Sequence, residues 1–302
     1  MDFHLNFKIH PFSNKISYNE KLLFIGSCFA ENIGELMQKY KFQVLINPNG
    51  IVFNPISISM ALNRIIEKKY FQEDKLFFSN ECWNSWEHHS KFSNTDKQKC
   101  LSIINNSISA SNNFLKECDW LFITFGSAFV YRLNSSGNIV SNCHKVPQKE
   151  FTKHLLEIED IVANYNDLIG RLKKFNPNLK IVLTVSPVRY LRDGLVENNI
   201  SKARLLEAVH QLTKMKDVFY FPAYELVVDD LRDYRFYKKD LMHPNEQAIE
   251  YVFEKLIEST FEEETKLLFE KIKNIITAKQ HRPININNEV YKKFKTSPVK
   301  LC

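Results

Sequence analysis

A serine near the start of the chain and an aspartate–histidine pair near its end have the spacing of a nucleophilic site. Ser27 closes an apolar run and opens a helical pattern, so its hydroxyl would lie at a helix N-terminus, which favours negative charge. Asp240 and His243 form a D-x-x-H pair, in which the carboxylate can orient the imidazole toward a nucleophile. Nucleophilic catalysis by serine is one interpretation, although the position of Ser27 alone is explained at least as well by a helix N-cap.

The scarcity of glycine excludes another kind of site. The chain has 302 residues but only seven glycines, and no two of them are closer than eight positions apart. Neither G-x-G-x-x-G nor G-x-x-x-x-G-K can therefore occur, and these are the glycine-rich loops that hold nucleotide phosphates. Nucleotide binding by either route is excluded.

Five strand-like runs must position these residues. Their apolarity is continuous rather than alternating, which is typical of parallel strands covered by helices on both faces. With the helical patterns between them, they predict a three-layer α/β fold around a mostly parallel five-stranded sheet. Ligands bind at the carboxyl ends of such strands, and Ser27 follows one of those ends. The runs span residues 21–27, 43–47, 119–126, 180–187 and 218–225.

The remaining segments indicate one domain with an extension. We expect a catalytic domain over residues 1–262 and a helical extension with a basic tail over residues 263–302. The stretch 55–118 is longer than one crossover requires and is interpreted as an insertion or lid. Residues 129–145 are typical of a hairpin that turns at residues 136–138.

The distribution of charge and apolar residues limits the partners. Residues 271–302 hold eight Lys or Arg against one Glu, a net charge of +7, so a total of +6 leaves −1 on the first 270 residues. A basic tail of this kind is typical of a solvated terminus, and we expect no nucleic-acid partner. There is no run of 18 apolar residues and no signal-peptide pattern, so we expect a cytoplasmic protein without membrane association. The pattern predicts no particular oligomeric state.

The residues around Ser27 carry a family resemblance. Residues 26–30 spell G-S-C-F-A, the signature of the GSCFA family, which the chain resembles over roughly residues 20–260. This family is similar to the SGNH (GDSL-like) hydrolases, so the resemblance implies a flavodoxin-like SGNH-hydrolase fold with an inserted segment. Further matching stretches follow in order: NPNGIVFNP (47–55), TFGSAFVY (124–131), NCHK (142–145), TVSPVR (184–189) and LRDYRFYKKDLMHP (231–244).

The resemblance also implies roles for individual residues. Ser27 would be the nucleophile, His243 the general base and Asp240 the orienting acid. The backbone amides of Ser27 and Gly50 would hold the oxyanion. Where the SGNH pattern has Gly-x-Asn, this chain has glycine, serine and alanine at 126–128, so the side-chain donor of that asparagine is absent.

Other residues are candidates for the absent donor and for substrate contacts. Ser127, Asn54 or Asn142 could supply the hydrogen bond, which typically contributes two to three orders of magnitude in rate. His89, in the expected insertion, and Asn142 and His144, near the hairpin, are candidate substrate-binding residues, although a lone histidine is more often structural.

We therefore expect a metal-independent serine hydrolase without a cofactor, an esterase that acts on a small acyl ester such as a carbohydrate O-acetyl group. An acyltransferase with the same triad and a non-catalytic binding protein on an SGNH-like fold are the alternatives. Cys28 is a competing nucleophile, because a thiol at a helix N-terminus can be acidified. If Ser27 faces the cleft, we expect Cys28 to face the core.

Overall fold

A parallel five-stranded sheet forms the centre of the protein. The computed structural model describes residues 7–280, and its strands follow the order β10-β9-β5-β1-β2, with every pair parallel. Numbered by their place in the chain, these strands run 2-1-3-4-5 from one edge, the flavodoxin-like order. The predicted fold class is confirmed. The strands are β1 (Lys21–Gly26), β2 (Gln43–Ile46), β5 (Trp120–Phe125), β9 (Lys180–Val185) and β10 (Val218–Tyr220).

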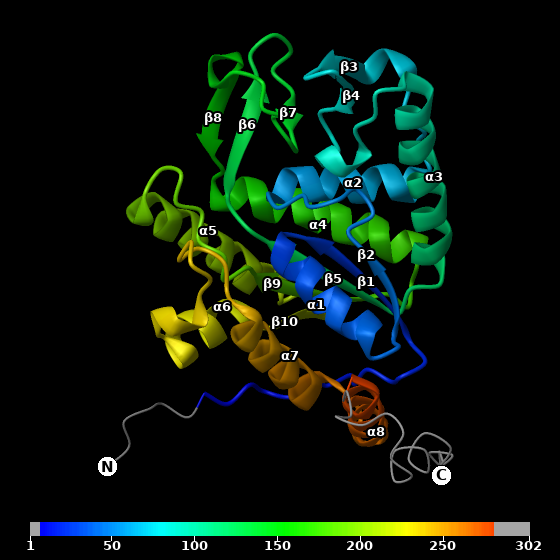
Figure 1. Ribbon diagram of the computed structural model, residues 1–302, viewed down its shortest axis with the longest axis vertical. Helices are drawn as coiled ribbons and strands as arrows, with labels where there is room; N and C mark the ends of the chain where they lie inside the picture. Colours follow the sequence, from blue (N-terminus) through cyan, green and yellow to red (C-terminus); the bar gives the residue numbers. More distant parts are fainter. Residues whose placement is uncertain (1–6, 281–302) are drawn as a thin grey trace, which may run out of the picture.

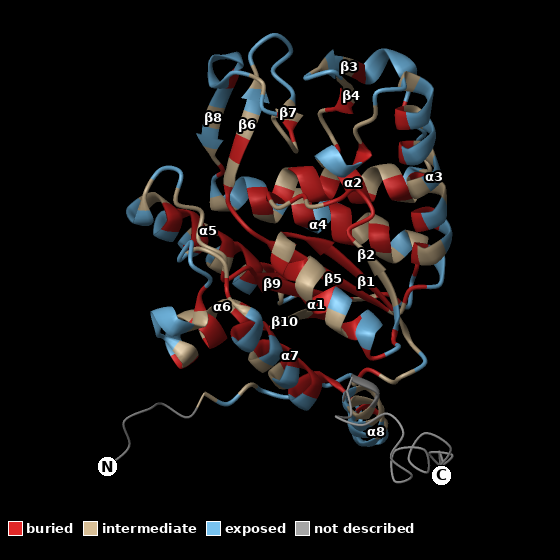
Figure 2. Ribbon diagram, viewed as in Figure 1, coloured by how far each residue is buried: buried red, intermediate tan, exposed pale blue. Residues whose placement is uncertain are grey.

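Alternate strand residues enter two separate cores, which explains the continuous apolarity of the runs. On β1, Leu23 and Ile25 pack into one core while Leu22 and Phe24 pack into the other. The buried sheet lies between helical layers (Figures 1 and 2). The first layer contains α2 (Pro55–Glu67), α4 (Ile158–Phe175) and α5 (Leu195–Leu212). The second contains α1 (Cys28–Lys39), α6 (Ala223–Glu225), a π-helical turn (Leu226–Leu231), α7 (Glu246–Thr260) and α8 (Glu263–Gln280).

The segment 55–118 divides between the central core and an outer unit. Its first helix, α2, buries Ile58, Leu62 and Ile65 in the first of the two main cores, so this part belongs to a main layer and is not a lid. The rest encloses a small third core. It consists of β3 (Leu76–Ser79), β4 (Cys82–Ser85), α3 (Lys97–Lys116) and short 3-10 turns at Glu73–Lys75 and Ser90–Phe92.

The predicted hairpin is present and has a third strand. β6 (Phe129–Leu133) pairs antiparallel with β7 (Ile139–Val140) across a turn that contains Gly137. β6 also pairs with β8 (Phe151–Leu155), which follows a 3-10 turn at Gln148–Glu150. Figure 1 shows this small sheet and the β3–β4 pair at the same end of the molecule.

The fifth strand is shorter than the apolar run 218–225 predicts. β10 ends at Tyr220, and Pro222 then caps α6. Proline has no N–H to donate to a strand ladder, so the second half of the run turns into helix. A further 3-10 turn, Tyr234–Phe236, precedes the Asp240–His243 loop.

The predicted C-terminal extension begins with α8, whose Phe269 packs into the α1–α7 core. The remainder of the basic tail, residues 281–302, lies outside the described residues. Within residues 7–280, no helix combines the length and the apolarity needed to cross a bilayer.

Candidate active site

Ser27 lies at the junction of β1 and α1. The preceding Gly26 has a φ of +143°, and a Cβ there would come within 2.2 Å of the Thr124 carbonyl oxygen, so only glycine fits this turn. Ser27 then caps α1, and its Oγ accepts a hydrogen bond from the Phe29 amide at 3.2 Å. The turn thus places the serine beside the first N–H groups of the helix.

Ser27 borders a cavity of ≈ 620 Å³ at the carboxyl edge of the sheet. Gly126, Ser127 and Ser186 line the same cavity, directly after β5 and β9. His243 reaches it from the loop before α7. The other walls are mostly apolar and come from Cys28, Ile51, Phe53, Val188, Arg189, Tyr190, Leu191, Arg192 and Met242.

Asp240 and His243 form the predicted pair. His243 Nδ1 lies 2.7 Å from Asp240 Oδ2, and Asp240 Oδ1 accepts from the amides of His243 at 3.0 Å and Met242 at 2.9 Å. These two amides, and then the imidazole, lower the pKa of the Asp240 carboxyl to about 2. Because an ionised carboxylate only accepts hydrogen bonds, Nδ1 carries the proton and Nε2 is left as an acceptor.

The loop after β9 holds this pair in place. The Arg189 amide donates to the Met242 carbonyl at 3.0 Å, and the Arg189 guanidinium donates to the Leu241 carbonyl at 3.2 Å. That guanidinium also lies 4.1 Å from the ring centre of Tyr237 and 4.8 Å from that of Tyr234. Arg189 therefore acts as a brace for the histidine loop.

The structure brings the three predicted triad residues to one site without closing the triad. Ser27 and His243 both line the cavity, but over residues 7–280 the Ser27 hydroxyl bonds the Phe29 amide and makes no hydrogen bond to His243. Catalytic hydrogen bonds are often long in structures without substrate and tighten in the complex.

Of the predicted oxyanion donors, Ser127 alone lies in the cavity wall with Ser27. The Ser27 amide donates to the Thr124 carbonyl at 3.2 Å, and the Gly50 amide donates to the Asn47 carbonyl at 2.7 Å. Gly50 has a φ of +74° and faces the His89 side chain. Asn54 caps α2 through Ser57. The structure therefore does not bring Gly50 or Asn54 to the cavity.

Of the predicted substrate-binding residues, His89 lies in the outer unit of segment 55–118, and Asn142 and His144 lie in the loop after β7. His89 Nδ1 accepts from the Lys91 amide at 3.3 Å, and Asn142 Oδ1 accepts from the His144 amide at 2.8 Å. His144 Nε2 lies 2.8 Å from the Ser85 carbonyl oxygen, and burial lowers the pKa of both imidazoles. Neither histidine, nor Asn142, is among the residues that line the Ser27 cavity.

The predicted orientation of Cys28 is wrong. The residue lines the cavity beside Ser27 and does not face the core. Burial, and then the Glu31 charge, raise the pKa of its thiol. The thiolate is the nucleophilic form, so this environment does not favour Cys28 as the nucleophile.

Several cavity residues were not predicted, and two of them are polar residues with a recognisable position. Ser186 and Arg189 both lie in the TVSPVR stretch, immediately after the fourth strand-like run. Their place after a parallel strand is the signal that could have identified them, since ligands bind at that edge.

The fold and the cavity define a three-layer α/β protein with serine, histidine and aspartate at the carboxyl edge of its sheet. Residues 21–256 match the GSCFA family, and the chain belongs to this family. The resemblance noted from the sequence is confirmed. No curated protein matches the chain in sequence.

Solved structures give distant likenesses. A carbohydrate esterase family 3 protein from Talaromyces cellulolyticus has 9% identity and a TM-score of 0.37, over 84% of this chain and 99% of that one. A family 3 carbohydrate esterase from Clostridium thermocellum has 12% identity and a TM-score of 0.36, over 87% and 100%. An acetyl xylan esterase from Butyrivibrio proteoclasticus has 13% identity and a TM-score of 0.41, over 82% and 64%. Likeness at this distance does not define the reaction of this chain.

Proposed function

We propose that this protein is a serine esterase with Ser27 as its nucleophile. One observation carries the proposal: Ser27, at the N-terminus of α1, borders the same cavity as His243, whose Nδ1 is held by Asp240. A nucleophile, a base and a group that orients the base are the parts that acyl transfer requires.

The reaction would proceed through an acyl-serine. For the attack, the Ser27 hydroxyl turns from the Phe29 amide toward His243 Nε2, which accepts its proton as Oγ bonds to the ester carbonyl carbon. The carbonyl electron pair moves onto the oxygen and forms a tetrahedral oxyanion. When this pair returns, the bond from the carbonyl carbon to the alcohol oxygen breaks, and the alcohol leaves with the proton that His243 held. Water attacks the acyl-serine in the same way, so that the carboxylic acid is released and Ser27 is restored.

The developing negative charge would lie beside two favourable groups. The N-terminus of α1 adjoins the cavity at Ser27 and Cys28, and a helix N-terminus stabilises an anion. Ser127, at the end of β5, borders the same space. Donors at such positions act in the transition state, where the carbonyl oxygen becomes charged.

The cavity walls suit a small ester with an apolar acyl part. Val188, Leu191 and Met242 are apolar residues in the wall of the cavity that His243 also lines. The cavity of ≈ 620 Å³ lies within the range of about 300–1,000 Å³ typical of small-molecule sites, so the alcohol part would be bound as well. An O-acetylated carbohydrate remains the predicted natural form of this substrate.

Fluorophosphonate labelling tests the proposal directly. The intact protein is treated with a fluorophosphonate, and the modified peptide is identified by mass spectrometry. We expect the label on Ser27, loss of labelling in Ser27→Ala, and retained labelling in Ser186→Ala, which removes another hydroxyl of the same cavity. A folded protein that is unlabelled at Ser27 and inactive on p-nitrophenyl acetate would refute the esterase.

A second candidate is a non-catalytic protein that binds a small molecule in this cavity. The hydrogen bond from the Phe29 amide to Ser27 Oγ favours it, because it uses the hydroxyl as a helix cap. This candidate predicts that ligand binding survives in Ser27→Ala and that the fluorophosphonate leaves the protein unmodified.

A further inference from the structure

A buried lysine forms hydrogen bonds with the ends of two strands that border the cavity. Lys202, on α5, is only 1% exposed, and its Nζ donates to the carbonyl oxygens of Gly126 and Ser186, each at 2.6 Å. Gly126 follows β5 and Ser186 follows β9, and both line the Ser27 cavity. The ammonium therefore lies behind the cavity wall.

This ammonium is held by carbonyl oxygens rather than by a carboxylate. In the described part of the chain, no Asp or Glu lies within ion-pair distance of it. The Tyr224 ring on α6 has its centre 5.9 Å from Nζ, and an ionised Cys28 thiol, on α1, would favour the ammonium. Burial lowers the pKa of the Lys202 ammonium to about 7. Burying an unpaired charge is unfavourable, so packing alone does not account for a lysine at this position.

The residue before Lys202 holds the same segment. Ser201 Oγ accepts from the Ala128 amide at 2.8 Å and lies 3.2 Å from Ser127 Oγ. Two consecutive residues of α5 thus fix residues 126–128, the stretch in which this chain lacks the SGNH asparagine.

The contact with Gly126 has an electronic consequence for its neighbour. The Gly126 carbonyl and the Ser127 N–H belong to one peptide group, so a cation on the oxygen polarises the N–H, and linked hydrogen bonds strengthen one another. The Ser127 N–H is only weakly engaged, because the Phe53 carbonyl oxygen lies 3.4 Å away, beyond the usual range of about 2.7–3.2 Å. The carbonyl of Ser186 has no such N–H, since Pro187 follows.

We propose that Lys202 is a positioning residue of the esterase site, which fixes the ends of β5 and β9 and polarises the Gly126–Ser127 peptide so that the Ser127 amide stabilises the oxyanion. This inference rests on the proposed function. The charged lysine supplies the effect, so kcat falls as pH rises and the ammonium loses its proton.

The test compares kcat and KM on p-nitrophenyl acetate from about pH 6 to about pH 9. Lys202→Met removes the charge, and Lys202→Arg keeps it. Lys173→Met is the matched control, because Lys173 Nζ also donates to a backbone carbonyl, that of Leu179, at 2.6 Å, but at the opposite end of β9. Thermal unfolding reports whether each variant is folded.

We expect Lys202→Met to lower kcat at neutral pH by about 10- to 100-fold, less than complete loss of an oxyanion donor, with little change in KM. Its alkaline fall in kcat should disappear. Lys202→Arg should recover part of kcat and show no alkaline fall, while Lys173→Met should keep the wild-type kcat.

Three results would overturn the inference: a folded Lys202→Met with wild-type kcat, an equal loss of kcat in Lys173→Met, or a wild-type kcat that does not fall at alkaline pH. The last measurement needs no variant, so the absence of an alkaline fall would overturn the inference even if both Lys202 variants fail to fold. An inactive wild type that the fluorophosphonate does not label would instead refute the esterase, and the role of Lys202 with it.

Discussion

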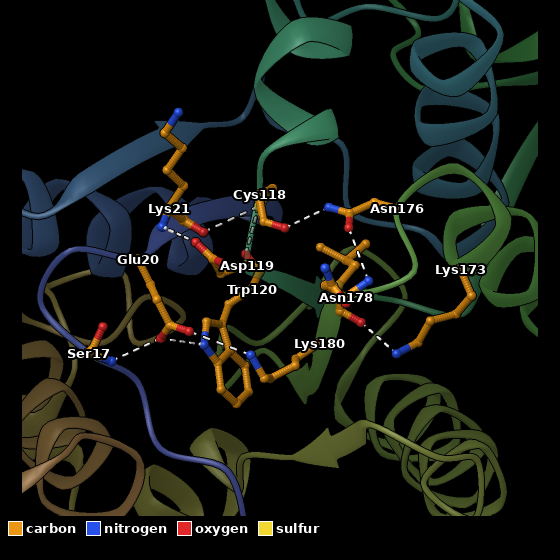
Figure 3. Close-up of polar contacts among 11 residues, drawn as sticks. Ser17, Glu20, Lys21, Cys118, Asp119, Trp120, Lys173, Asn176, Asn178 and Lys180 are labelled. Carbon is orange, nitrogen blue, oxygen red and sulfur yellow. Dashed lines mark hydrogen bonds and ion pairs between the residues drawn. The ribbon is translucent and has the colours of Figure 1, made fainter.

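Polar side chains have different surroundings at the two edges of the central sheet. At the amino edge, which Figure 3 shows, the Glu20 carboxylate accepts from the Ser17 amide and the Trp120 indole, each at 2.9 Å, and lies 3.5 Å from the Lys180 ammonium. Asp119 accepts from the Lys21 amide at 2.8 Å. These groups satisfy one another and the strand ends.

At the carboxyl edge, polar groups face an open cavity instead. Ser27, Ser127 and His243 line it, although the two hydroxyls also accept backbone hydrogen bonds, from the Phe29 and Phe129 amides. Buried polar groups that pair within the protein stabilise the fold, whereas groups left toward a cavity are available to a ligand. The comparison teaches that the amino edge serves stability and the carboxyl edge serves chemistry.

The largest expected effect that separates the edges is loss of the nucleophile. Ser27→Ala should lower kcat by about 10⁴-fold or more, because no other group forms the acyl-serine. Stability should fall by about 1 kcal/mol, since a helix cap is lost. Steady-state kinetics on p-nitrophenyl acetate and chemical denaturation measure the two effects. A variant that keeps most of its kcat would contradict the assignment of the carboxyl edge to chemistry.

Asp240→Asn should have the next largest effect. An asparagine amide can donate to Nδ1 and so favour the tautomer in which Nε2 carries the proton, which lowers kcat by about 10²- to 10⁴-fold. The nearby Asp233→Asn, which alters a cap on the Arg235 amide, should leave kcat unchanged. An equal loss in both variants would mean that the loop, rather than the carboxylate, is responsible.

The lowered pKa of Asp240 predicts how the contribution of this carboxylate to stability depends on pH. Because that pKa is lowered from 3.8 to about 2, the carboxylate contributes fully to folding above the unfolded value, and this contribution is lost progressively as the pH falls through the folded value. The difference in free energy of unfolding between wild type and Asp240→Asn, measured by chemical denaturation, should therefore shrink as the pH falls from about 4 toward about 2. A difference that stays constant through this acid range would contradict the lowered pKa of Asp240.

The pH dependence of stability tests Lys202, which lies behind the cavity at the carboxyl edge. Burial lowers the pKa of Lys202 from 10.5 to about 7, so between these pH values the unfolded chain binds a proton that the folded chain has lost, and stability rises with pH. Each unit of pKa difference corresponds to about 1.4 kcal/mol. The free energy of unfolding of wild type relative to Lys202→Met should therefore increase across this window. A constant difference would show that Lys202 does not titrate there.

The smallest effect should come from the amino edge. Glu20→Ala leaves the buried Trp120 indole N–H without its acceptor, which should reduce stability by about 1–3 kcal/mol. We expect kcat to be unchanged, because Glu20 lies at the opposite edge from the cavity. Denaturation and kinetics on the same preparation test this, and a large fall in kcat in a folded Glu20→Ala would break the division between the edges.

Much of the fold could be predicted because its signals are local. The five apolar runs, the helical patterns and the hairpin at Gly137 each arise from neighbouring residues. The run at 218–225 was overextended, since apolarity continues beyond Pro222 although strand pairing does not.

The site was harder to predict where a residue depends on distant partners. Lys202 lies on the same buried face of α5 as Leu205, Ala208 and Val209. A charged residue on an apolar helix face was therefore the signal by which the sequence could have indicated Lys202. The carbonyl oxygens that receive it lie 76 and 16 positions away. No spacing rule connects such residues.

The sequence by itself determined the order of the main elements and the Asp240–His243 pair, because each depends on contacts within a few residues. Tertiary structure decided which donors remain for a ligand. It placed Ser127 in the cavity wall, left the Gly50 amide away from that wall and set Lys202 behind it. Whether a residue reaches the cavity depends on segments far apart in the chain, which only the folded protein brings together.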